Sequence, residues 1–597
     1  MTGSEKRFFL DVRRSANGLA WEHRLDPRQE NLSLAIAQGH GVSEIVARIL
    51  AGRGVLPEDA AGFLDPTIRA LLPDPASLTD MTVAAERIAD AIIRSERVAI
   101  FGDYDVDGAV SSALLKRFLA HYGVESEIYI PDRIFEGYGP NPDAMRELAA
   151  RGARLIVTVD CGTNSAEAIE AGRQAGADIV VLDHHQVGGA LPPAVAVVNP
   201  NREDDLSGQG HLCAAGVVFL ALVQTAKVLR ERRHATPGPD LLSMLDLVAL
   251  GTVCDVVPLT GINRAFVVKG LLVARQLKLP GLAALARVSR VGEPLNPYHF
   301  SFLIGPRINA GGRIGNAALG SNLLATADPA EANAIADTLD QLNRERQDME
   351  TQMLAEARAE AEAEISAGGG PAVVVTASES WHPGIVGLIA SRLKEFIRRP
   401  VFAIAFNANG IGTGSGRSIT GFDLGKLVRE AVAQGLLIKG GGHAMAAGIT
   451  VERAKLGELR AFFEERAGEA VTRLRDLESL KIDAALSAEG ATFDLLDALE
   501  AAGPYGSGHP SPVLALPHHR LVDARTVGNG HVRVDLSSQG GGRLQAIAFR
   551  AAETDLGRFL FENRGATVHV AGSLAANNWN GMRSVQFRIV DAAKAAP

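Results

Sequence analysis

Residues 97–198 alternate short apolar runs with stretches of helical pattern, and this alternation constrains the fold more than any other feature. One helical stretch is opened by Asn141-Pro142, and another is closed by Gly176. Strands separated by helices run parallel, so the pattern predicts an α/β domain on a doubly wound parallel sheet over 91–327. The five predicted strands are VAIF (98–101), EIYIP (127–131), RLIVTV (154–159), ADIVVL (177–182) and AVAVV (194–198).

The length of the chain, 597 residues, is too great for a single hydrophobic core, and we expect several domains. A start signal at Asp328-Pro329 and a stop at the glycines 368–370 predict one helix over 328–367. At about 1.5 Å per residue this helix would span roughly 55 Å, which favours a connector between two domains over a surface helix. A second α/β unit is predicted over 368–475.

The C-terminal part of the sequence has an all-β pattern. Five short strands follow residue 517, which is typical of a small barrel such as an OB-fold. Asn580-Gly581 predicts a hairpin turn within it. The remaining predicted parts are an N-terminal extension with small helices (1–90), a linking segment (476–516) and the barrel itself (517–597).

The composition is that of an ordinary soluble globular protein, with 47% apolar and 22% charged residues. The sequence contains no uncharged apolar run of about 18 residues, and its N-terminus lacks the apolar region of a secretory signal. Three cysteines without paired spacing fit a reducing cytoplasm. The net charge of −9 argues mildly against a nucleic-acid partner, but residues 520–597 hold ten Lys/Arg and six Asp/Glu, which is compatible with local contact to nucleic acid.

Acidic residues and histidines follow three of the predicted strands. In an open parallel sheet, ligands bind beyond the carboxyl ends of the strands, so these side chains should meet at one edge. Asp255, in LGTVCDVVPL after an apolar helical run, is a further candidate. The residues that follow the strands are Asp103, Asp105 and Asp107 after the first, Asp160 after the third, and Asp183, His184 and His185 after the fourth.

Several carboxylates cannot all stay ionised at a dry edge without a positive counter-charge. Oxygen and imidazole ligands suit Mn²⁺ or Mg²⁺, and no cysteine pattern indicates zinc. Two such ions sharing a carboxylate could activate a water and stabilise the leaving oxygen of a phosphoryl transfer. Taken singly, each motif has a simpler interpretation: Asp107-Gly108 as a turn, Asp160 as a helix cap, and His184-His185 as core or surface residues. Their coincidence at successive strand ends favours the metal site.

With these residues identified, the chain resembles the DHH phosphoesterase superfamily, which is named for the triplet seen at residues 183–185. Within the superfamily, it is similar to the exonucleases specific for single-stranded DNA, over most of its length. The resemblance implies a DHH domain, a DHHA1 domain over the second α/β unit and a C-terminal OB-fold. The motifs that carry it are FGDYDVDG, IPDRIFEGYG, VTVDCGTN, LDHHQ, LPPAVAVVNPNRED, LGTVCDVVPL, GPRINAGGRIG, WHPGIVGLIASRL, GSGRS and GGGHAMAAG.

The resemblance also implies roles for single residues. Asp160 would bridge two metal ions and, with His185 and Asp183, form the catalytic group. His185 would face the substrate phosphate, and Asp183 would orient the histidines. The implied metal ligands are Asp103, Asp105, Asp107, Asp160, His184 and Asp255.

Two glycine-rich motifs and one arginine-containing motif predict contacts with the substrate. The guanidinium in GSGRS could grip a phosphate, and GGGHAMAAG could form an anion nest, although either glycine run could be only a tight turn. GPRINAGGRIG is expected to be a loop that contacts successive phosphates, with surface salt bridges as the alternative. Two aromatic residues could stack on bases or could be packing residues. The candidate contacts are Tyr138, Arg307, Asn309, Arg313, Ser415, Arg417, Gly441, Gly442, His443 and Trp579.

Together these features predict a metal-dependent exonuclease that degrades single-stranded DNA to 5′-mononucleotides with two metal ions, in DNA repair or recombination. The 5′→3′ direction is implied by the resemblance alone. We expect a monomer, with a single-strand-binding protein and a helicase as candidate partners. One alternative is a phosphatase or nuclease for small nucleotides, which would not need the barrel. Another is a binding or scaffold protein on a degenerate phosphoesterase fold, which the intact acidic set disfavours.

Overall fold

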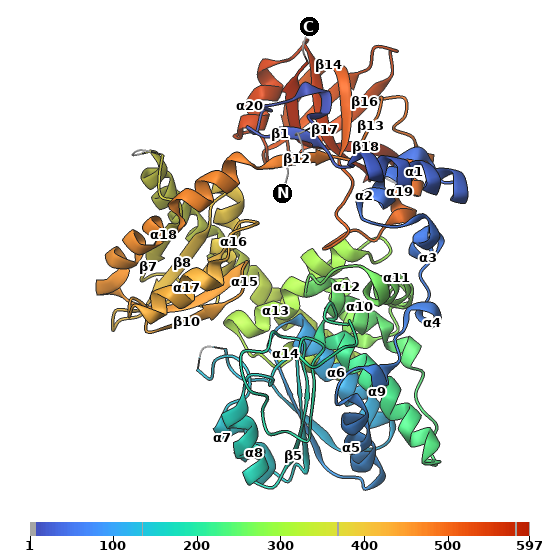
Figure 1. Ribbon diagram of the computed structural model, residues 1–597, viewed down its shortest axis with the longest axis vertical. Coiled ribbons are helices and arrows are strands. Elements are labelled where there is room, and N and C mark those ends of the chain that lie inside the picture. The colour runs from blue at the N-terminus through green and yellow to red at the C-terminus, as the bar shows by residue number, and fades with distance from the viewer. Residues whose placement is uncertain (1–6, 134, 367–368, 580–581, 596–597) are drawn as a thin grey trace. The chain divides into compact units, whose positions relative to one another are not determined.

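The computed structural model describes residues 7–133, 135–366, 369–579 and 582–595, and the chain divides into two compact units (Figure 1). The larger unit comprises Leu72–Val257 and Gly261–Leu477. The smaller unit comprises Met1–Leu71, Pro258–Thr260 and Glu478–Pro597. Within the described ranges, every helix is too short or too polar to cross a lipid bilayer.

The larger unit begins with a five-stranded parallel sheet, which confirms the predicted doubly wound domain. The strand order is β3-β2-β4-β5-β6, so the chain reverses direction across the sheet after β3. Apolar runs form these strands because helices cover both faces, and every residue of β2 and β4 is buried. The strands are β2 (Val98–Gly102), β3 (Ser126–Tyr129), β4 (Leu155–Val159), β5 (Asp178–Leu182) and β6 (Ala196–Val198).

Helices on the two faces of this sheet complete its core. On one face, α7 and α8 pack against Phe101, Ile156 and Val181. On the other face lie α5, α6 and α9 (Figure 1). The side chain of Asn141 caps α7 by accepting the N–H of Ala144, as the Asn-Pro start signal predicts. The helices are α5 (Met81–Ile93), α6 (Val106–His121), α7 (Pro142–Ala150), α8 (Ala166–Gln174) and α9 (Ala214–Glu231).

A helical segment follows the sheet and leads into one long helix. This helix, α15 (Pro329–Ser366), confirms the connector predicted over 328–367. It packs against α12, α13 and α14 and also against α16 and β7, so it joins the two α/β parts of the larger unit. The preceding helices are α10 (Leu245–Cys254), α11 (Gly261–Ala274), α12 (Pro280–Val288), the π-helix η5 (His299–Ile304), α13 (Gly305–Ile314) and α14 (Leu319–Ala325).

The second α/β domain is a five-stranded sheet in the order β10-β11-β9-β8-β7. Only β7 and β8 pair in parallel. The glycines of GSGRS lie in the central strand β9, where added Cβ atoms at Gly414 and Gly416 would collide with Ile449 and Phe402. The elements are β7 (Val374–Ser378), α16 (Val386–Ile397), β8 (Val401–Phe406), β9 (Ile411–Arg417), α17 (Leu424–Ala433), β10 (Lys439–Gly442), β11 (Ala446–Glu452) and α18 (Leu456–Asp476).

The smaller unit contains a closed five-stranded barrel, as predicted for an OB-fold. The order β14-β15-β16-β18-β17 closes through a further pairing of β14 with β17. A helix between β16 and β17, α20 (Asp555–Glu562), was not predicted. The predicted hairpin turn at Asn580-Gly581 lies outside the described residues. The strands are β14 (Leu514–Val527), β15 (His531–Ser537), β16 (Arg543–Ala548), β17 (Thr567–Trp579) and β18 (Met582–Lys594).

N-terminal residues belong to the same unit as this barrel. Strand β1 (Ala20–His23) pairs in parallel with β12 (Ser479–Ile482). Trp21 is fully buried and donates from Nε1 to Oδ2 of Asp591 at 2.9 Å. Asp483 is also fully buried, and its carboxylate forms ion pairs with the guanidinium groups of Arg24 and Arg53.

The N-terminal segment, the predicted link and the barrel were expected to be separate parts, but most of their residues belong to one compact unit. The range 476–516, predicted as a link, holds β12, β13 (Ala484–Ala485) and α19 (Phe493–Ala502), and β13 pairs with β14 of the barrel. The predicted N-terminal extension ends within α5, which is part of the larger unit. Its helices in the smaller unit are α1 (Pro27–His40), α2 (Glu44–Gly52), α3 (Ala60–Leu64) and α4 (Ile68–Leu71).

Candidate metal centre

The carboxyl ends of β2, β4 and β5 bring ionisable side chains to one edge of the parallel sheet, as the sequence predicts. Ligand atoms there lie close enough to share cations. His184 Nε2 is 3.3 Å from Oδ1 of Asp160, 3.7 Å from Oδ2 of Asp255 and 3.8 Å from Oδ2 of Asp107. Three sets of residues have ligand atoms within 4.8 Å of one another: Asp103–Asp105–Asp160, Asp160–His184–His185 and Asp107–His184–Asp255.

Two carboxylate oxygens at this edge are buried and accept no hydrogen bond: Oδ1 of Asp103 and Oδ1 of Asp160. Burial, and then neighbouring carboxylates, raise the pKa of both groups well above the ordinary range. The same causes raise the pKa of Asp255 to about 9. Buried carboxylates without partners require a counter-charge, so this set of oxygen and imidazole donors fits hard divalent cations such as Mn²⁺ or Mg²⁺.

The backbone at Asp160 adopts an uncommon conformation, with φ of +62°. Residues other than glycine rarely occupy this left-handed region, and such strain is concentrated at functional sites. The N–H of Asp160 donates to the carbonyl of Leu182 at 3.0 Å, which ties this turn to the end of β5. Asp160 belongs to two of the three ligand sets, as does His184.

Asp107 and Gly108 lie in the first turn of α6, so the interpretation of this pair as a simple turn is wrong. The Asp107 carboxylate accepts the N–H groups of Ala214 and Ala215 at 2.6 and 3.0 Å, at the N-terminus of α9, where the helix dipole favours an anion. A Cβ at Gly108 would lie 2.5 Å from the carbonyl oxygen of Asp103. Glycine therefore lets α6 start this close to the end of β2.

Asp183 is hydrogen-bonded on both oxygens, unlike Asp103 and Asp160. Its Oδ1 accepts the N–H of His184 at 2.7 Å and lies 2.8 Å from Nδ1 of His185, while Oδ2 accepts the N–H of Thr163 at 3.1 Å. Burial alone would raise the pKa of Asp183, but His185 and Thr163 hold it well below its usual range. Burial likewise opposes a charge on His185, yet Asp183 raises the pKa of that imidazole. This geometry fits a residue that orients the histidine.

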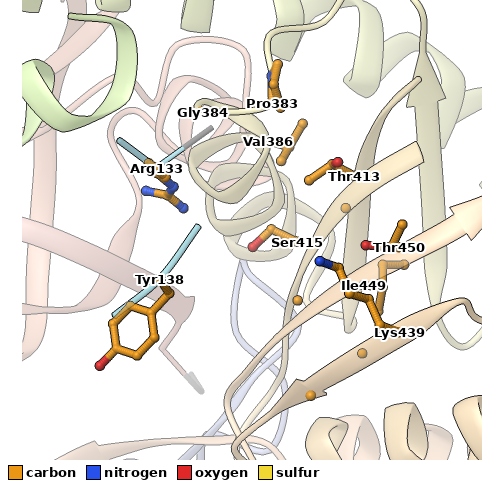
Figure 2. A pocket seen from close by; sticks show the side chains of 14 residues that line it. Arg133, Tyr138, Pro383, Gly384, Val386, Thr413, Ser415, Lys439, Ile449 and Thr450 are labelled. Atoms are coloured by element: carbon orange, nitrogen blue, oxygen red, sulfur yellow. The ribbon is translucent and has the colours of Figure 1, made fainter. Parts of the chain in front are cut away.

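A cleft of about 540 Å³ lies within the larger unit (Figure 2). One side is the loop after β3, which contributes Arg133 and Tyr138, and the other is the sheet surface formed by β9, β10 and β11. The Tyr138 hydroxyl donates to the backbone carbonyl of Asp160 at 3.2 Å and lies 3.2 Å from Nδ1 of His185. Tyr138 therefore links the cleft to the candidate metal centre.

Arg133 lines the cleft, whereas Arg313 and Arg417 lie outside its lining and are each bonded to a residue that lines it. Arg417 donates to the Ser415 hydroxyl at 2.8 Å, and Arg313 donates to the carbonyl of Gly384 at 3.1 Å. Burial, followed by repulsion from Arg133 and other arginines, lowers the pKa of Arg313 to about 10; burial and Arg133 also lower that of Arg417. Among the described residues, none of these three guanidinium groups forms an ion pair with a carboxylate. Such a cluster suits a phosphate.

Sequence reasoning missed two basic residues that line this cleft, Arg133 and Lys439. Arg133 stands in IPDRIFEGYG beside the tyrosine that was selected, and Lys439 directly precedes the glycine run of GGGHAMAAG. A basic residue next to a motif already assigned to the substrate was the available signal in both places.

The motif GPRINAGGRIG forms α13, so the prediction of a loop is wrong. Gly311 and Gly312 favour the helix here because they let it approach the backbone of Asn316 and Tyr104 closely. Asn309 is half-buried on this helix. Arg307 is ion-paired with Asp340 at 2.8 Å, the arrangement that the salt-bridge alternative describes.

The remaining candidate contacts are only partly at the cleft. Ser415 and Gly441 line it, whereas Gly442 and His443 are exposed and lie outside its lining. The glycines of GGGHAMAAG extend along β10, so the predicted anion nest is wrong for this segment. Trp579 ends β17, and its side chain lies outside the described ones.

Comparisons with known proteins place these features in one family. Models of the DHH family N-terminal domain, the DHHA1 domain and the RecJ OB domain match residues 97–252, 369–469 and 482–591. The single-stranded-DNA-specific exonuclease RecJ of Escherichia coli is 36% identical over 561 residues, which cover 91% of this chain and 95% of that protein. The RecJ of Thermus thermophilus is 34% identical, with 92% of this chain and 76% of that protein covered.

Solved structures agree with this assignment. A crystal structure of Thermus thermophilus RecJ in complex with Mn²⁺ has a TM-score of 0.79 at 30% identity, covering 97% of this chain and 80% of that one. The corresponding Mg²⁺ complex has a TM-score of 0.73 at 29% identity, covering 97% and 79%. The predicted DHH, DHHA1 and OB domains are confirmed. The chain therefore belongs to the RecJ family of DHH-domain proteins.

Proposed function

We propose that this chain is a metal-dependent exonuclease that degrades single-stranded DNA from its 5′ end to 5′-mononucleotides. The observation that carries the proposal is the contact between the acidic edge and the arginine-lined cleft through Tyr138. The substrate is supported by the curated relatives, which are named for single-stranded DNA; this chain covers 95% of the Escherichia coli protein.

The metal ligands proposed are those implied by the sequence, Asp103, Asp105, Asp107, Asp160, His184 and Asp255. Two divalent ions held by these side chains would activate a water and stabilise the leaving oxygen of the phosphodiester. The His185 imidazole, held through Nδ1 by Asp183, presents its other nitrogen to a phosphate oxygen. An N–H of this imidazole would donate a hydrogen bond to developing negative charge.

The cleft is proposed to hold a terminal phosphate group on Arg133, Arg313, Arg417 and Ser415. Guanidinium groups bind phosphate oxygens in pairs, and these three have no competing carboxylate among the described residues. Binding of the terminal phosphate would place the first phosphodiester next to Tyr138 and His185. This arrangement would give the enzyme its preference for a chain end and for the 5′→3′ direction.

We also propose a role in DNA repair or recombination, a monomeric state in the cytoplasm, and contacts with a single-strand-binding protein and a helicase. The OB barrel is proposed to bind additional nucleotides, because such barrels hold single strands by stacking and charge.

Digestion of end-labelled oligonucleotides tests the proposal directly. Single-stranded substrates with a 5′ phosphate, a 5′ hydroxyl or a blocked 5′ end are compared with a duplex, in Mn²⁺ and in EDTA. We expect mononucleotide release from the 5′-phosphorylated single strand and none in EDTA. Equal activity in EDTA, or release of nucleotides from the 3′ end, would contradict the proposal. Preferential hydrolysis of dinucleotides would support the small-nucleotide alternative.

A further inference from the structure

Behind the metal edge, the turn that follows β6 carries a fully buried asparagine, Asn199. Its Nδ2 donates to the hydroxyl of Thr163 at 2.9 Å and to the backbone carbonyl of His185 at 2.8 Å. Its Oδ1 accepts the N–H of Asn201 at 2.8 Å. Both polar atoms of the amide are therefore engaged by protein groups, so Asn199 is not available as a metal ligand.

The two groups that receive these hydrogen bonds belong to different strand ends. Thr163 is fully buried in the segment after β4, three residues beyond Asp160, and its N–H holds Oδ2 of Asp183. His185 belongs to the segment after β5. A single amide thus connects the segment that carries Asp160 with the segment that carries the histidines.

The same turn also holds the neighbouring histidine. Asn201 donates from Nδ2 to the backbone carbonyl of His184. Two asparagines of one turn therefore bind the carbonyls of two consecutive residues, which fixes the main chain from which both imidazoles project. His184 belongs to two of the three ligand sets, and His185 belongs to one.

The turn is itself anchored by Arg202 and Asp80. Arg202 is buried, and its guanidinium donates to the carbonyl of Val197 and to Oδ2 of Asp80 at 2.7 Å. The same Asp80 oxygen accepts the N–H of Val197 at 3.1 Å. The turn that carries Asn199 therefore has a fixed position relative to β6.

We infer that Asn199 is a positioning residue of the metal centre, which sets the separation between Asp160 and the two histidines by joining their backbone segments through Thr163 and His185. The inference rests on the proposed function, because it concerns the same centre. Metal sites depend on the groups that orient their ligands, and losing one such group typically costs about 10–100-fold in metal affinity or activity.

A space-filling role for Asn199 would have a different signature. An asparagine that only fills space could be exchanged at a cost in stability, with the metal centre unchanged in the molecules that fold. A positioning residue acts through its hydrogen bonds. Removing the hydroxyl of Thr163, which accepts one of them, should therefore weaken the metal centre as the loss of Asn199 does. Valine keeps the shape of Thr163 without the hydroxyl, and serine keeps the hydroxyl.

The test compares Asn199→Ala, Thr163→Val and Thr163→Ser in the full-length chain. Mn²⁺ affinity is measured by calorimetry and by electron paramagnetic resonance, and the unfolding midpoint is measured with and without Mn²⁺. Asn343→Ala is the control, because Asn343 is a buried asparagine on α15 whose Oδ1 accepts from Arg346 instead of facing the metal edge. Activity on single-stranded DNA is resolved into kcat and KM.

We expect Asn199→Ala and Thr163→Val to weaken Mn²⁺ binding about 10–100-fold and to lower kcat, with KM for DNA within about twofold of the original chain. Thr163→Ser should retain Mn²⁺ affinity. Asn343→Ala should lower the unfolding midpoint measured without metal. Added Mn²⁺ should raise that midpoint by as much as it does in the original chain. If Asn199→Ala fails to fold, Thr163→Val can still overturn the inference by keeping the Mn²⁺ affinity of the original chain; a loss in that variant would include the contact of the Thr163 side chain with Asp183.

Mn²⁺ affinity in Asn199→Ala or Thr163→Val equal to that of the original chain would overturn the inference. An equal loss of affinity in Asn343→Ala would also overturn it, because the effect would then be general destabilisation. Failure of the original chain to bind Mn²⁺ at all would instead overturn the proposed function, so the two failures are distinguishable.

Discussion

The metal edge and the cleft carry charges of opposite sign, and they are built in different ways. The carboxylates of the edge are short aspartate side chains at strand ends, at a helix start and at a helix end, so the backbone fixes where each of them lies. The arginines at and beside the cleft come from a loop, a helix and a strand. Hydrogen bonds hold the side chains of Arg313 and Arg417, and the Arg133 guanidinium lies over the Tyr104 ring.

This difference indicates how each region tolerates change. An aspartate carboxylate is only one methylene group away from the backbone, so a neighbouring side chain cannot take its place, and loss of a carboxylate at the edge should be severe. Guanidinium groups on long side chains can reach the same phosphate, so replacing one arginine should weaken substrate binding only in part.

Asp160→Ala should lower hydrolysis of single-stranded DNA by more than about 100-fold, because even residues that only orient metal ligands cost about 10–100-fold. DNA binding in the absence of hydrolysis should persist, since the cleft is unchanged. Single-turnover digestion and fluorescence anisotropy measure the two quantities. Asp143→Ala is the control, because Asp143 is exposed on α7 and pairs only with Arg146. Substantial remaining hydrolysis would remove Asp160 from the centre.

Arg417→Ala should raise KM for 5′-phosphorylated single strands by about 10–100-fold, since hydrogen bonds to charged groups contribute about 1.5–3 kcal/mol. The effect on kcat should be smaller, because Arg417 is proposed to hold the terminal phosphate and not the phosphodiester that is cleaved. Steady-state kinetics on 5′-phosphate and 5′-hydroxyl substrates measures it, with exposed Arg146→Ala as the control. An equal KM for the variant and the original chain on the phosphorylated substrate would show that the phosphate binds elsewhere.

Without metal, the free energy of unfolding should fall as the pH rises from about 4 to about 9. The lower limit is the ordinary pKa of an unfolded carboxyl, and the upper limit is the raised pKa of Asp255, about 9. A carboxyl whose pKa is raised by folding binds its proton more tightly in the folded state, so its stabilising effect is present at low pH and is lost as it ionises. Thermal unfolding in EDTA at several pH values measures this slope, and Asp255→Asn should reduce it. Added Mn²⁺ should reverse the loss at high pH. A stability that rises steadily to pH 9 in EDTA would contradict the burial of uncompensated acids.

Tyr138→Phe should have the smallest effect, a decrease in kcat of about 3–10-fold, because one neutral hydrogen bond contributes about 0.5–1.5 kcal/mol. The change removes the hydroxyl that contacts the Asp160 carbonyl and His185 but keeps the ring in the cleft. Tyr298→Phe, at an exposed tyrosine outside the cleft, is the matched control. Identical kcat values for Tyr138→Phe and the original chain would show that ring contact alone joins the two regions.

The sheet, its order of helices and the acidic edge could be predicted because strand periodicity and strand ends are local signals. The same reasoning failed where packing between distant segments decides the conformation. The glycines of α13 resemble a loop in sequence, yet close contacts with Tyr104 and Asn316 favour a helix. Arg133 lies in a loop without periodicity; its place in a motif assigned to the substrate was a local signal, but that signal could not show that Arg133 lines a cleft with residues of β9 and β11. Asn199 was within a recognised motif, but its role depends on hydrogen bonds to two other strand ends.

The parallel pairing of β1 with β12 sets an order of events during synthesis. The residues of β1 cannot pair with β12 until about 460 further residues have left the ribosome, and Trp21 meets Asp591 only after 570 further residues. The larger unit, whose residues all lie between these partners, can fold first, since domains generally fold as units during synthesis. A nascent chain stalled before residue 478 should therefore already carry the catalytic machinery, with its first 71 residues still waiting for the barrel.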